Sequence, residues 1–593
     1  MHRSSLEADP DLLRLVIDRF ENGDAGEAID AILADAERPD VVLNDLFGVG
    51  QDGWYTLVSD AIDGDCLDIG PGFGRHIHLL EALADTVYAL EPDPLRLRFL
   101  HARARGIDVV PVRGAENDIP FEPGSFDTVI AREDPADSGP FCDRIDRLSS
   151  LLAADGSLVI ELDGITRASG LTRLAGLETA NAGRSFRSLS GLSQSLLPRY
   201  ASSLERAGFE SVQWYAICPT GRWFEWIIPL DGTATDWLLA SQRPSSTYGQ
   251  LLHATATAAS RLGALKHLYP TYLAVCEKTG RSGESETTEV LRRGATRSIV
   301  FELSDGTIQR VRKPPNDPRH AHFNERAASV LSHLYAGPTS FTETLPAVSL
   351  EESATGPVLV DEPMQGDPLR TTVQPRTLRE DPQYFDQVLR TGLEWIEQLH
   401  DGFSGEIKCF SPEQAQKTLS IEALDFVPPL PSSPVRYRSV PQHGDFHPGN
   451  VVVDESGSIT TVIDWEYAAF RANPVADPAF YALKLAEYAY GDFERGIHRC
   501  FVESTPQSRV IYDRLGSFCA EASIDPETFA HYVGSSFVEQ ISTHFEADTP
   551  YQHHTTPRNK LATLEFLYVH VETVRDRLSR QVPDRPISAL RSD

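Results

Sequence analysis

The sequence predicts two domains of different class, an α/β domain in the N-terminal half and an α+β domain in the C-terminal half. Three observations point to this. A short apolar strand at Asp65–Ile69 runs into the glycine-rich turn Gly70–Gly74, and a strand, a glycine turn and a helix in this order are typical of parallel α/β sheets. Near the other end, Val451–Val453 and Thr461–Ile463 flank turn residues as a short hairpin. Between the halves, Thr279–Thr288 is polar and rich in Gly and Ser, as linkers are.

The length of the chain indicates more than one domain. At 593 residues the chain is too long for a single hydrophobic core. We expect a helical cap at 1–60, the α/β domain at 61–278, a linker at 279–290 and the α+β domain at 291–593. In the cap, apolar residues recur at helical spacing from Leu12 to Phe20. The cap either only covers the α/β domain or forms a lid over its acceptor.

The chain is strongly acidic and nearly free of lysine. Lysine and arginine total 54 against 86 aspartates and glutamates, a formal net charge of −32, and only seven of the basic residues are lysines. Acidic, lysine-poor surfaces keep proteins solvated in concentrated salt, so we expect a halophilic protein of the cytoplasm. A merely acidic protein would explain the sign of the charge but not the loss of lysine. The charge also argues against nucleic acid as a partner, because a phosphate backbone needs basic patches.

Cysteine spacing and hydropathy exclude other classes of protein. The seven cysteines are widely scattered without a CxxC pair, so neither a zinc site nor a disulfide framework is expected. No apolar run approaches about 18 residues, so no integral membrane segment is expected. Glu7, Asp9 and Asp11 stand where a signal peptide needs positive charge and then an apolar stretch, which favours the cytoplasm.

The glycine turn of the α/β domain is suited to a nucleotide-derived cofactor. Glycines after a strand let the backbone approach a ligand closely and open a helix N-terminus toward it. Val87–Leu90 forms the next strand and ends at Glu91, where an acid can accept hydrogen bonds from two ribose hydroxyls. Both features occur in dinucleotide and S-adenosylmethionine sites. Here the pattern is GxGxG, and Arg75 stands where the dinucleotide pattern GxGxxG needs its third glycine.

These residues resemble class I S-adenosylmethionine-dependent methyltransferases. The match covers Leu67–Gly74, Glu91–Asp93, Ile119–Asp127 and Leu151–Val159 in the family's usual order. The resemblance implies a glycine loop around the methionine moiety, an acid on the ribose and a loop beside adenine. The implied cofactor-binding residues are Asp68, Gly70, Gly72, Gly74, Glu91 and Glu116. Which acid of the 115–118 loop touches the adenine stays open. A Rossmann-like domain with another ligand, or with none, is the alternative.

The acceptor side of this domain is poorly specified. Methyl transfer from a sulfonium needs in-line positioning, plus a base if the acceptor is a hydroxyl. Acceptors approach such sheets after the fourth strand, Thr128–Ala131, and there we predict Glu133 as the base. A solvated loop of Arg132, Glu133 and Asp134 is the alternative. His76, at the first turn of the helix after the glycine loop, is another candidate base, or else a plain capping or surface residue.

The second domain is organised around His443–Asn450, which reads His-Gly-Asp-Phe-His-Pro-Gly-Asn. Asp445 precedes Asn450 by five residues, the spacing at which a phosphotransferase loop sets a catalytic carboxylate beside a metal-binding amide. The hairpin that follows would carry Asn450 and Asp464 to neighbouring positions, where they can share Mg²⁺ on the phosphates of a nucleotide. One HxD alone is common, but loop, hairpin and second aspartate together favour a kinase.

This motif resembles the aminoglycoside phosphotransferase and choline kinase-like superfamily, from near Leu291 onward. The resemblance implies a two-lobed kinase fold with ATP as the donor. The implied site residues are Asp445 as catalytic base, Asn450 and Asp464 as metal ligands, Lys313 paired with Glu325 as the nucleotide clamp, and Glu362 in the adenine hinge. A surface lysine and a solvated helix glutamate are the alternative for the clamp. Arg293–Ser298 has a single glycine where a glycine-rich loop is expected, so how the phosphates are covered stays open.

The sequence therefore predicts an α/β Rossmann-like methyltransferase domain joined to an α+β two-lobed protein-kinase-like domain. We predict a bifunctional enzyme that uses S-adenosylmethionine and, with Mg²⁺, ATP to modify a small-molecule or carbohydrate acceptor, such as the end of a glycan or glycolipid precursor. In the alternative, one half has lost activity and serves as a ligand-sensing or scaffolding module, and the kinase-like half is the better suited to that. The oligomeric state stays open.

Overall fold

The computed structural model of the chain has two compact units. The first comprises residues 1–321 and 351–363, and the second comprises residues 322–350 and 364–593. The structure describes residues 10–22, 28, 31–32, 42, 46, 52–132, 141–164, 197–219, 224–230, 232–241, 247–279, 287–294, 296–410, 435–522, 524–525, 529–530 and 569–581.

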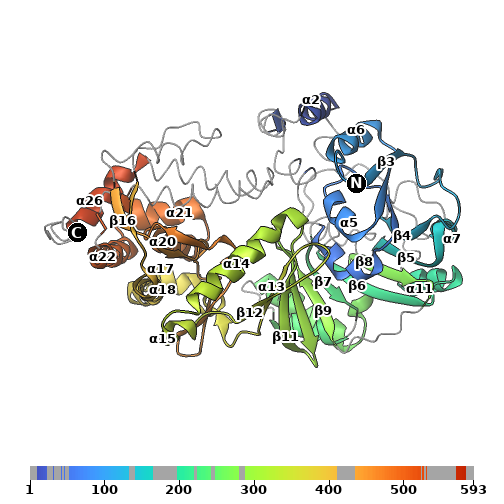
Figure 1. The fold of residues 1–593 in the computed structure, drawn as a ribbon. Coiled ribbons are helices and arrows are strands. Elements are labelled where there is room, and N and C mark those ends of the chain that lie inside the picture. The colour runs from blue at the N-terminus through green and yellow to red at the C-terminus, as the bar shows by residue number, and fades with distance from the viewer. Residues whose placement is uncertain are drawn as a thin grey trace. The chain divides into compact units, whose positions relative to one another are not determined.

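Five parallel strands form one end of the sheet in the first unit (Figure 1). They are β1 (Asp65–Ile69), β2 (Thr86–Glu91), β3 (Val109–Arg113), β4 (Phe126–Ala131) and β5 (Leu152–Asp163). Their order is β3-β2-β1-β4-β5, and all four pairings are parallel. The order reverses between β1 and β4, and sheets of this kind bind ligands at the carboxyl ends of the strands on either side of such a reversal.

Antiparallel strands extend this sheet beyond β5. β8 (Thr271–Glu277) pairs with β5 and with β6 (Ser211–Pro219), and β6 pairs with β7 (Phe224–Pro229). β7 then pairs with β9 (Thr288–Arg292), and the sheet continues through β10 (Ile299–Ser304), β11 (Thr307–Lys313) and β13 (Val358–Asp361). One sheet thus joins strands that the sequence assigns to different domains. For this reason the first unit runs on past the expected linker at 279–290.

The parallel strands β1 and β4 are buried on both faces of the sheet. Alternate residues of β1 pack into separate clusters, Leu67 and Ile69 in one and Cys66 in the other. The helices and turns around it are α2 (Pro10–Glu21), η2 (Gly53–Leu57), η3 (Ser59–Ala61), α5 (Ile77–Leu83), α6 (Pro94–Arg103), α7 (Phe141–Leu151), α11 (Leu197–Arg206), α12 (Gly232–Ser241), α13 (Thr247–Arg261), η4 (Leu265–His267) and η5 (Pro318–His320). Of the cap predicted at 1–60, the structure describes α2 and two 3₁₀ turns as named elements.

The second unit is largely helical. Its longest described helix is α18 (Pro382–Phe403). It starts after Asp381, whose carboxylate accepts the N–H groups of Gln383 and Tyr384. It packs against α20 (Ala476–Tyr490) and α22 (Pro506–Glu521). The other helices are α14 (Ala321–Leu334), α15 (Thr339–Thr342), α16 (Leu369–Thr372), α17 (Pro375–Glu380), η6 (Trp465–Tyr467), α20 (Ala476–Tyr490), α21 (Phe493–Ile497), η7 (His498–Val502), α22 (Pro506–Glu521) and α26 (Val571–Gln581).

Short strands complete the second unit. They are β14 (Asp367–Pro368), β15 (Ile407–Phe410), β16 (Val435–Arg438), β17 (Val440–Gln442), β18 (Val451–Val453), β19 (Ile459–Val462) and β20 (Ala469–Ala472), and β12 (Val348–Glu351) lies at the boundary of the units. β18 and β19 form the hairpin that the sequence predicts, with its turn at Asp454–Gly457. Among the described residues, no helix has both the length and the hydropathy that a membrane crossing requires.

Candidate active sites

The glycine loop after β1 borders open space. Gly70, Gly72 and Gly74 have φ angles of 74°, 64° and 64°, a region that L side chains rarely adopt. A Cβ atom on Gly70 or Gly72 would meet nothing within 4 Å, whereas one on Gly74 would clash with Leu100 of α6. The first two glycines therefore leave room for a ligand beside the backbone, and the third lets the loop pack against α6.

Glu91, the last residue of β2, is held by the backbone. Its Oε2 accepts the N–H of Gly72 at 3.1 Å, and its Oε1 accepts the N–H of Asp93 at 3.0 Å. The side chain is buried, and this burial raises the pKa of Glu91 to about 7, although both backbone bonds oppose the shift. A carboxylate has about four lone-pair sites, so Glu91 can still accept hydrogen bonds from two hydroxyl groups.

Asp68, just before the glycine loop, forms a buried pair with His76. Its Oδ2 lies 2.7 Å from His76 Nε2, and both side chains are excluded from solvent. Asp68 Oδ1 has no hydrogen-bond partner among the described residues. A buried carboxylate oxygen without a donor is costly, so a ligand that brings an N–H donor would fit here. His76 occupies the N-cap position of α5 but makes no side-chain capping bond, and it is buried and therefore not a surface residue.

Arg132, directly after β4, connects this pair to the N-terminal segment. Its Nη2 lies 3.1 Å from His76 Nδ1, 3.1 Å from Tyr55 OH and 3.2 Å from Asp52 Oδ1. Arg75 also pairs with Asp52. Burial opposes the ionisation of Asp52, but the charges of Arg75 and Arg132 outweigh it and lower the pKa of this carboxyl. Arg132 Nε is buried and has no partner among the residues that the structure describes.

These contacts also assign the tautomer of His76. Because Arg132 can only donate, His76 Nδ1 accepts, and the ring carries its hydrogen on Nε2, where it faces Asp68. Both ring nitrogens are thus engaged. This argues against His76 as the base for a methyl acceptor.

Glu116, expected beside adenine, is bound by an arginine. Arg144 of α7 lies 2.5 Å and 2.8 Å from the two carboxylate oxygens, and its side chain is buried. Arg144 Nη2 also donates to the carbonyl of Arg132 at 2.8 Å, which ties the Glu116 loop to the end of β4. Glu133, predicted as the base, and Asp134 lie outside the described residues.

In the second unit, the catalytic-loop motif brings its polar side chains together. Asn450 Nδ2 donates to the carbonyl of Asp445 at 3.0 Å and to its Oδ2 at 3.1 Å. The amide oxygen of Asn450 is therefore the atom left for a cation. His447 Nε2 lies 3.4 Å from the same Oδ2, while His447 Nδ1 accepts the N–H of Gly449 at 2.9 Å. Both His447 and Asn450 thus direct a donor at one oxygen of Asp445.

Asp477 braces this loop from α20. Its two carboxylate oxygens accept the N–H of His443 at 2.7 Å and the N–H of Gly444 at 3.0 Å. Burial raises the pKa of Asp477 to about 7 against the effect of these two bonds. His443 is also buried, which lowers its pKa to about 4, and its Nε2 donates to the carbonyl of Ile463 at 2.8 Å. A neutral histidine therefore joins the loop to the hairpin.

Through the pairing of its strands, the hairpin brings the backbone of Ile463, the residue before Asp464, beside that of Asn450. Val451 pairs with Val462, and the N–H of Ile463 donates to the carbonyl of Asn450 at 2.9 Å. Asp464 follows with a φ of 72°, a left-handed conformation that non-glycine residues rarely adopt and that is often found at functional sites.

The predicted nucleotide clamp is divided between the two units. Lys313 Nζ, at the end of β11, lies 2.7 Å from Asp361 Oδ2, and both side chains are buried. Glu362 follows Asp361 and is exposed. Glu325 lies on α14 in the second unit and is also exposed.

A metal ion at the catalytic loop of the second unit would have few protein ligands. Among the described residues, no group of three or more His, Cys, Asp or Glu side chains is arranged to hold a metal ion. Mg²⁺ carried by a nucleotide keeps water and phosphate oxygens and is bound by one or two carboxylates of a protein. Asp464 would supply one such carboxylate, and Asn450 would add an amide oxygen.

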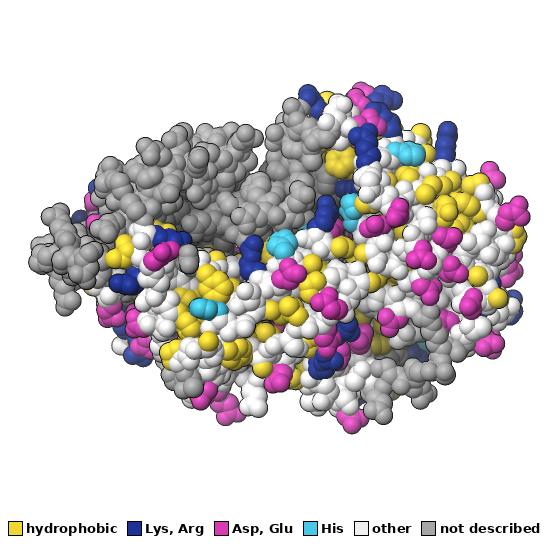
Figure 2. Space-filling model, in the orientation of Figure 1, with side chains coloured by type: hydrophobic (Ala, Val, Ile, Leu, Met, Phe, Trp, Pro, Cys, Tyr) yellow, Lys and Arg dark blue, Asp and Glu magenta, His cyan; other side chains and the backbone are white. Residues whose placement is uncertain are grey.

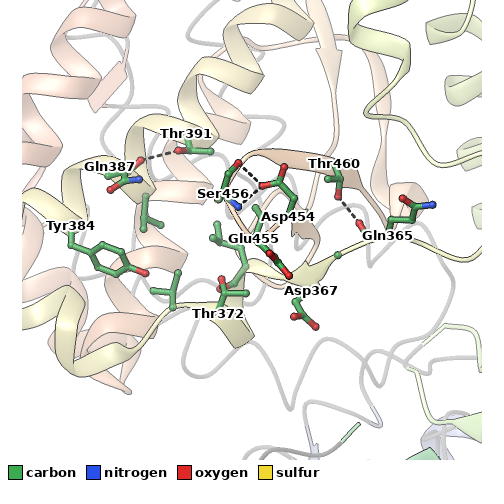
Figure 3. A pocket seen from close by; sticks show the side chains of 16 residues that line it. Gln365, Asp367, Thr372, Tyr384, Gln387, Thr391, Asp454, Glu455, Ser456 and Thr460 are labelled. Carbon is green, nitrogen blue, oxygen red and sulfur yellow. Dashed lines mark hydrogen bonds between the residues drawn. The ribbon is translucent and has the colours of Figure 1, made fainter. Parts of the chain in front are cut away.

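A separate pocket lies at the turn of the hairpin (Figure 3). It has a volume of about 890 Å³ and is lined by residues of 365–373, of α18 and of the β18–β19 turn. Tyr384, Gln387 and Thr391 come from α18, as the close view shows. Neither Asp445 nor Asn450 lines it. Asp454 Oδ1 already accepts the N–H groups of Ser456 and Ser458, so this carboxylate serves the turn.

Several polar residues of these sites carry no motif in the sequence. Asp52 and Tyr55 precede β1 in a segment predicted only as part of a helical cap. Arg144 and Asp361 join the sites through tertiary contacts, the first with Glu116 and the second with Lys313. In the sequence, the only indication of a site in this segment is that an acidic residue and two aromatic residues flank Gly53, and this indication is weak.

One segment in each half of the chain matches a protein family. Residues 67–134 match a methyltransferase domain, and residues 290–491 match the phosphotransferase enzyme family. The chain therefore carries a methyltransferase domain of Rossmann-like fold and a kinase-like phosphotransferase domain, as the sequence predicts. No curated protein matches the chain.

Solved structures similar to the chain align with about two fifths of it. An S-adenosylmethionine-dependent methyltransferase from Mesorhizobium loti is 15% identical over 38% of this chain and 99% of its own, with a TM-score of 0.24. Geranyl diphosphate methyltransferase in complex with GPP and sinefungin is 15% identical over 38% of this chain and 77% of its own, with a TM-score of 0.23. The [4+2]-cyclase SpnF is 20% identical over 39% of this chain and 81% of its own, with a TM-score of 0.25.

Proposed function

We propose that the protein is a bifunctional transferase, an S-adenosylmethionine-dependent methyltransferase and an ATP-dependent phosphotransferase that acts on hydroxyl groups of a small-molecule or carbohydrate acceptor. The observation that carries the proposal is the Asp445–Asn450 contact, which leaves the amide oxygen for a cation beside a carboxylate that can act as a base. The two family matches support the two kinds of group transfer, of methyl and of phosphoryl groups.

In the methyltransferase domain, the proposed cofactor contacts involve polar atoms that have no hydrogen-bond partner or that can accept further hydrogen bonds. Asp68 Oδ1 would accept from the ammonium of the methionine moiety, and Gly70 and Gly72 leave space for its chain. Glu91 would accept from the ribose hydroxyls. S-adenosylmethionine supplies an electrophilic methyl group, and the protein has to place the acceptor in line with it. The base remains assigned to Glu133.

On the phosphotransferase side, Asp445 would accept the proton of the acceptor hydroxyl while Asn450 and Asp464 hold Mg²⁺. His447 and Asn450 keep the Asp445 carboxylate in one orientation through their contacts with Oδ2. Lys313, Glu325 and Glu362 would contact the nucleotide. An acceptor on a glycan or glycolipid precursor suits two transferases that modify neighbouring hydroxyls.

Calorimetry in concentrated salt tests the proposal. The wild type should bind S-adenosylhomocysteine without Mg²⁺ and a non-hydrolysable ATP analogue only with Mg²⁺. Asp464→Ala should lose the second binding event and keep the first, and Glu91→Ala should do the reverse, so each variant is the control of the other. Asp445→Asn should keep nucleotide binding and lose phosphoryl transfer.

Absence of Mg²⁺-dependent nucleotide binding in the wild type would contradict the phosphotransferase assignment. The kinase-like half would then be a ligand-sensing or scaffolding module beside an active methyltransferase. Unchanged cofactor affinity in Glu91→Ala would contradict the ribose assignment.

A further inference from the structure

We infer that Arg132 and His76 position the carboxylate of Asp68 to receive the ammonium group at the amino-acid end of the cofactor. Asp52 and Tyr55 support them from the segment before β1. The inference deepens the proposed methyltransferase function and rests on it. Asp68 would touch the cofactor, and the other four residues act through it as positioning residues. All five lie within the first unit.

Asp68 and Arg132 lie where a sheet of this kind binds its ligand. Asp68 belongs to β1 and Arg132 directly follows β4, and these two strands are paired neighbours. The order of the strands reverses between them, and ligands bind at the carboxyl ends of such strands. A Cβ atom on Gly70, two residues after Asp68, would meet nothing within 4 Å. Both polar residues also fall within the segment 67–134 that matches a methyltransferase domain.

The ring of His76 is held by three neighbours. Its Nε2 donates to Asp68 Oδ2 at 2.7 Å, and its Nδ1 accepts from Arg132 Nη2 at 3.1 Å. The ring of Tyr55 stacks on it, with 5.2 Å between the ring centroids and 21° between their planes. Each ring nitrogen thus has one role, and the ring cannot turn over without losing a hydrogen bond.

This orientation engages one oxygen of Asp68 and leaves the other for a ligand. Oδ2 receives the hydrogen of His76, whereas Oδ1 is buried and has no partner among the described residues. A buried carboxylate oxygen gains most from a charged donor. In S-adenosylmethionine the charged donor is the ammonium group of the methionine moiety, since adenine and ribose offer neutral donors. The arrangement therefore favours the amino-acid end of the cofactor.

Asp52 and Tyr55 keep Arg132 in place for this contact. Arg132 Nη2 lies 3.2 Å from Asp52 Oδ1 and 3.1 Å from Tyr55 OH, the same nitrogen that donates to His76. Asp52 is buried, and Arg75 pairs with it from the glycine-loop side of the chain. Because His76 Nδ1 accepts a hydrogen from Arg132, it carries none of its own. His76 therefore brings no positive charge that would compete with an ammonium group for Asp68.

A purely structural role for these contacts predicts a different result. If they only fastened the segment before β1 to the sheet, their loss would weaken binding of every part of the cofactor alike. If they position Asp68, their loss weakens only the contact with the amino-acid end. A ligand with this end and a ligand without it therefore distinguish the two roles.

Calorimetry on the full chain with two such ligands tests the inference. S-adenosylhomocysteine carries the amino-acid end, and 5′-methylthioadenosine keeps adenine, ribose and sulfur without it. Arg132→Met removes the donor to His76 and should raise the Kd of S-adenosylhomocysteine about threefold to tenfold, the effect of one hydrogen bond. The Kd of 5′-methylthioadenosine should stay within about twofold, which is less than one hydrogen bond contributes.

Two controls accompany this variant. Arg147→Met removes an exposed arginine of α7 and should change neither Kd. Glu91→Ala should weaken both ligands, because both keep the ribose that Glu91 is proposed to bind. Asp68→Asn removes the proposed contact itself and should show the largest selective loss for S-adenosylhomocysteine.

A pair of variants at His76 serves if Arg132→Met does not fold. His76→Leu removes both hydrogen bonds of the ring and should give the same selective loss. His76→Gln offers an amide N–H to Asp68 and an amide oxygen to Arg132, so it should recover part of the affinity. Equal losses for the two ligands, or no loss for S-adenosylhomocysteine, would overturn the inference while the proposed function stands. Failure of the wild type to bind S-adenosylhomocysteine would overturn both.

Discussion

Glu91 is the residue whose ionisation should govern cofactor affinity. Burial raises its pKa to about 7, so the free protein holds it protonated in a growing fraction of molecules as the pH falls below 7. Ribose hydroxyls donate best to the ionised form. We expect the affinity for S-adenosylhomocysteine to rise between pH 6 and pH 8. Calorimetry at several pH values should show this rise in the wild type and a weaker, flat profile in Glu91→Gln; a flat wild-type profile would contradict the role.

His447 should act as a positioning residue for Asp445. Its Nδ1 is taken by the Gly449 N–H, so its Nε2 hydrogen points to Asp445 Oδ2 at 3.4 Å. A hydrogen bond to a charged group is worth about 1.5–3 kcal/mol, so loss of this contact should cost at most roughly 10- to 150-fold in kcat. His447→Ala should show this loss in phosphoryl transfer with an unchanged KM for ATP. His447→Gln, which keeps a donor, should recover part of it, and equal loss in both variants would contradict positioning through this hydrogen.

Residues close in sequence could be predicted, and residues joined by tertiary contacts could not. Asp445 and Asn450 lie in one loop, and the hairpin could be predicted because turn residues separate two apolar runs. Asp361 stands directly before Glu362 of the expected adenine hinge, and its pairing with Lys313 is not predicted by the sequence. That pair forms because β11 and β13 are neighbours in the sheet, which no local pattern reports.

At the level of elements, strand pairing joins the two parts of the chain that the polar segment is predicted to separate. The segment 279–290 has the polarity of a linker, but β9, which begins within it at Thr288, pairs with β7 before it. Aromatic packing supports this junction, since Trp226 stacks on Phe301 with 6.0 Å between ring centroids and Trp237 lies 5.2 Å from the same ring. These aromatics, on β7, β10 and α12, are partly buried against the core of the first unit.

A cut inside the polar segment tests this junction. If a protease site is inserted within residues 280–286 and cleaved, the two pieces should remain associated, because separation would expose the edges of β7 and β9 together with Trp226 and Phe301. Gel filtration after cleavage should show one species. Uncleaved protein with the same insertion is the control. Two separate, soluble and folded pieces would contradict a continuous sheet.

At the level of the whole molecule, charge is the dominant feature. The net charge of −32 comes with 86 acidic residues, and carboxylates are scattered over the visible face of the molecule (Figure 2). Self-repulsion of this size opposes the compact state. Salt weakens it, because the screening length falls from about 10 Å at 0.1 M to about 3 Å at 1 M.

We therefore expect the Tm to rise steeply between about 0.1 M and about 1 M KCl, the range over which the screening length becomes shorter than the spacing of surface charges. Differential scanning fluorimetry measures this directly. Sucrose at equal osmolality is the control, because it stabilises by exclusion from the surface without screening charge, and its effect should be smaller at low ionic strength. A Tm that stays level or falls over this range would show that the acidic surface is not an adaptation to salt. The lack of lysine would then need another cause.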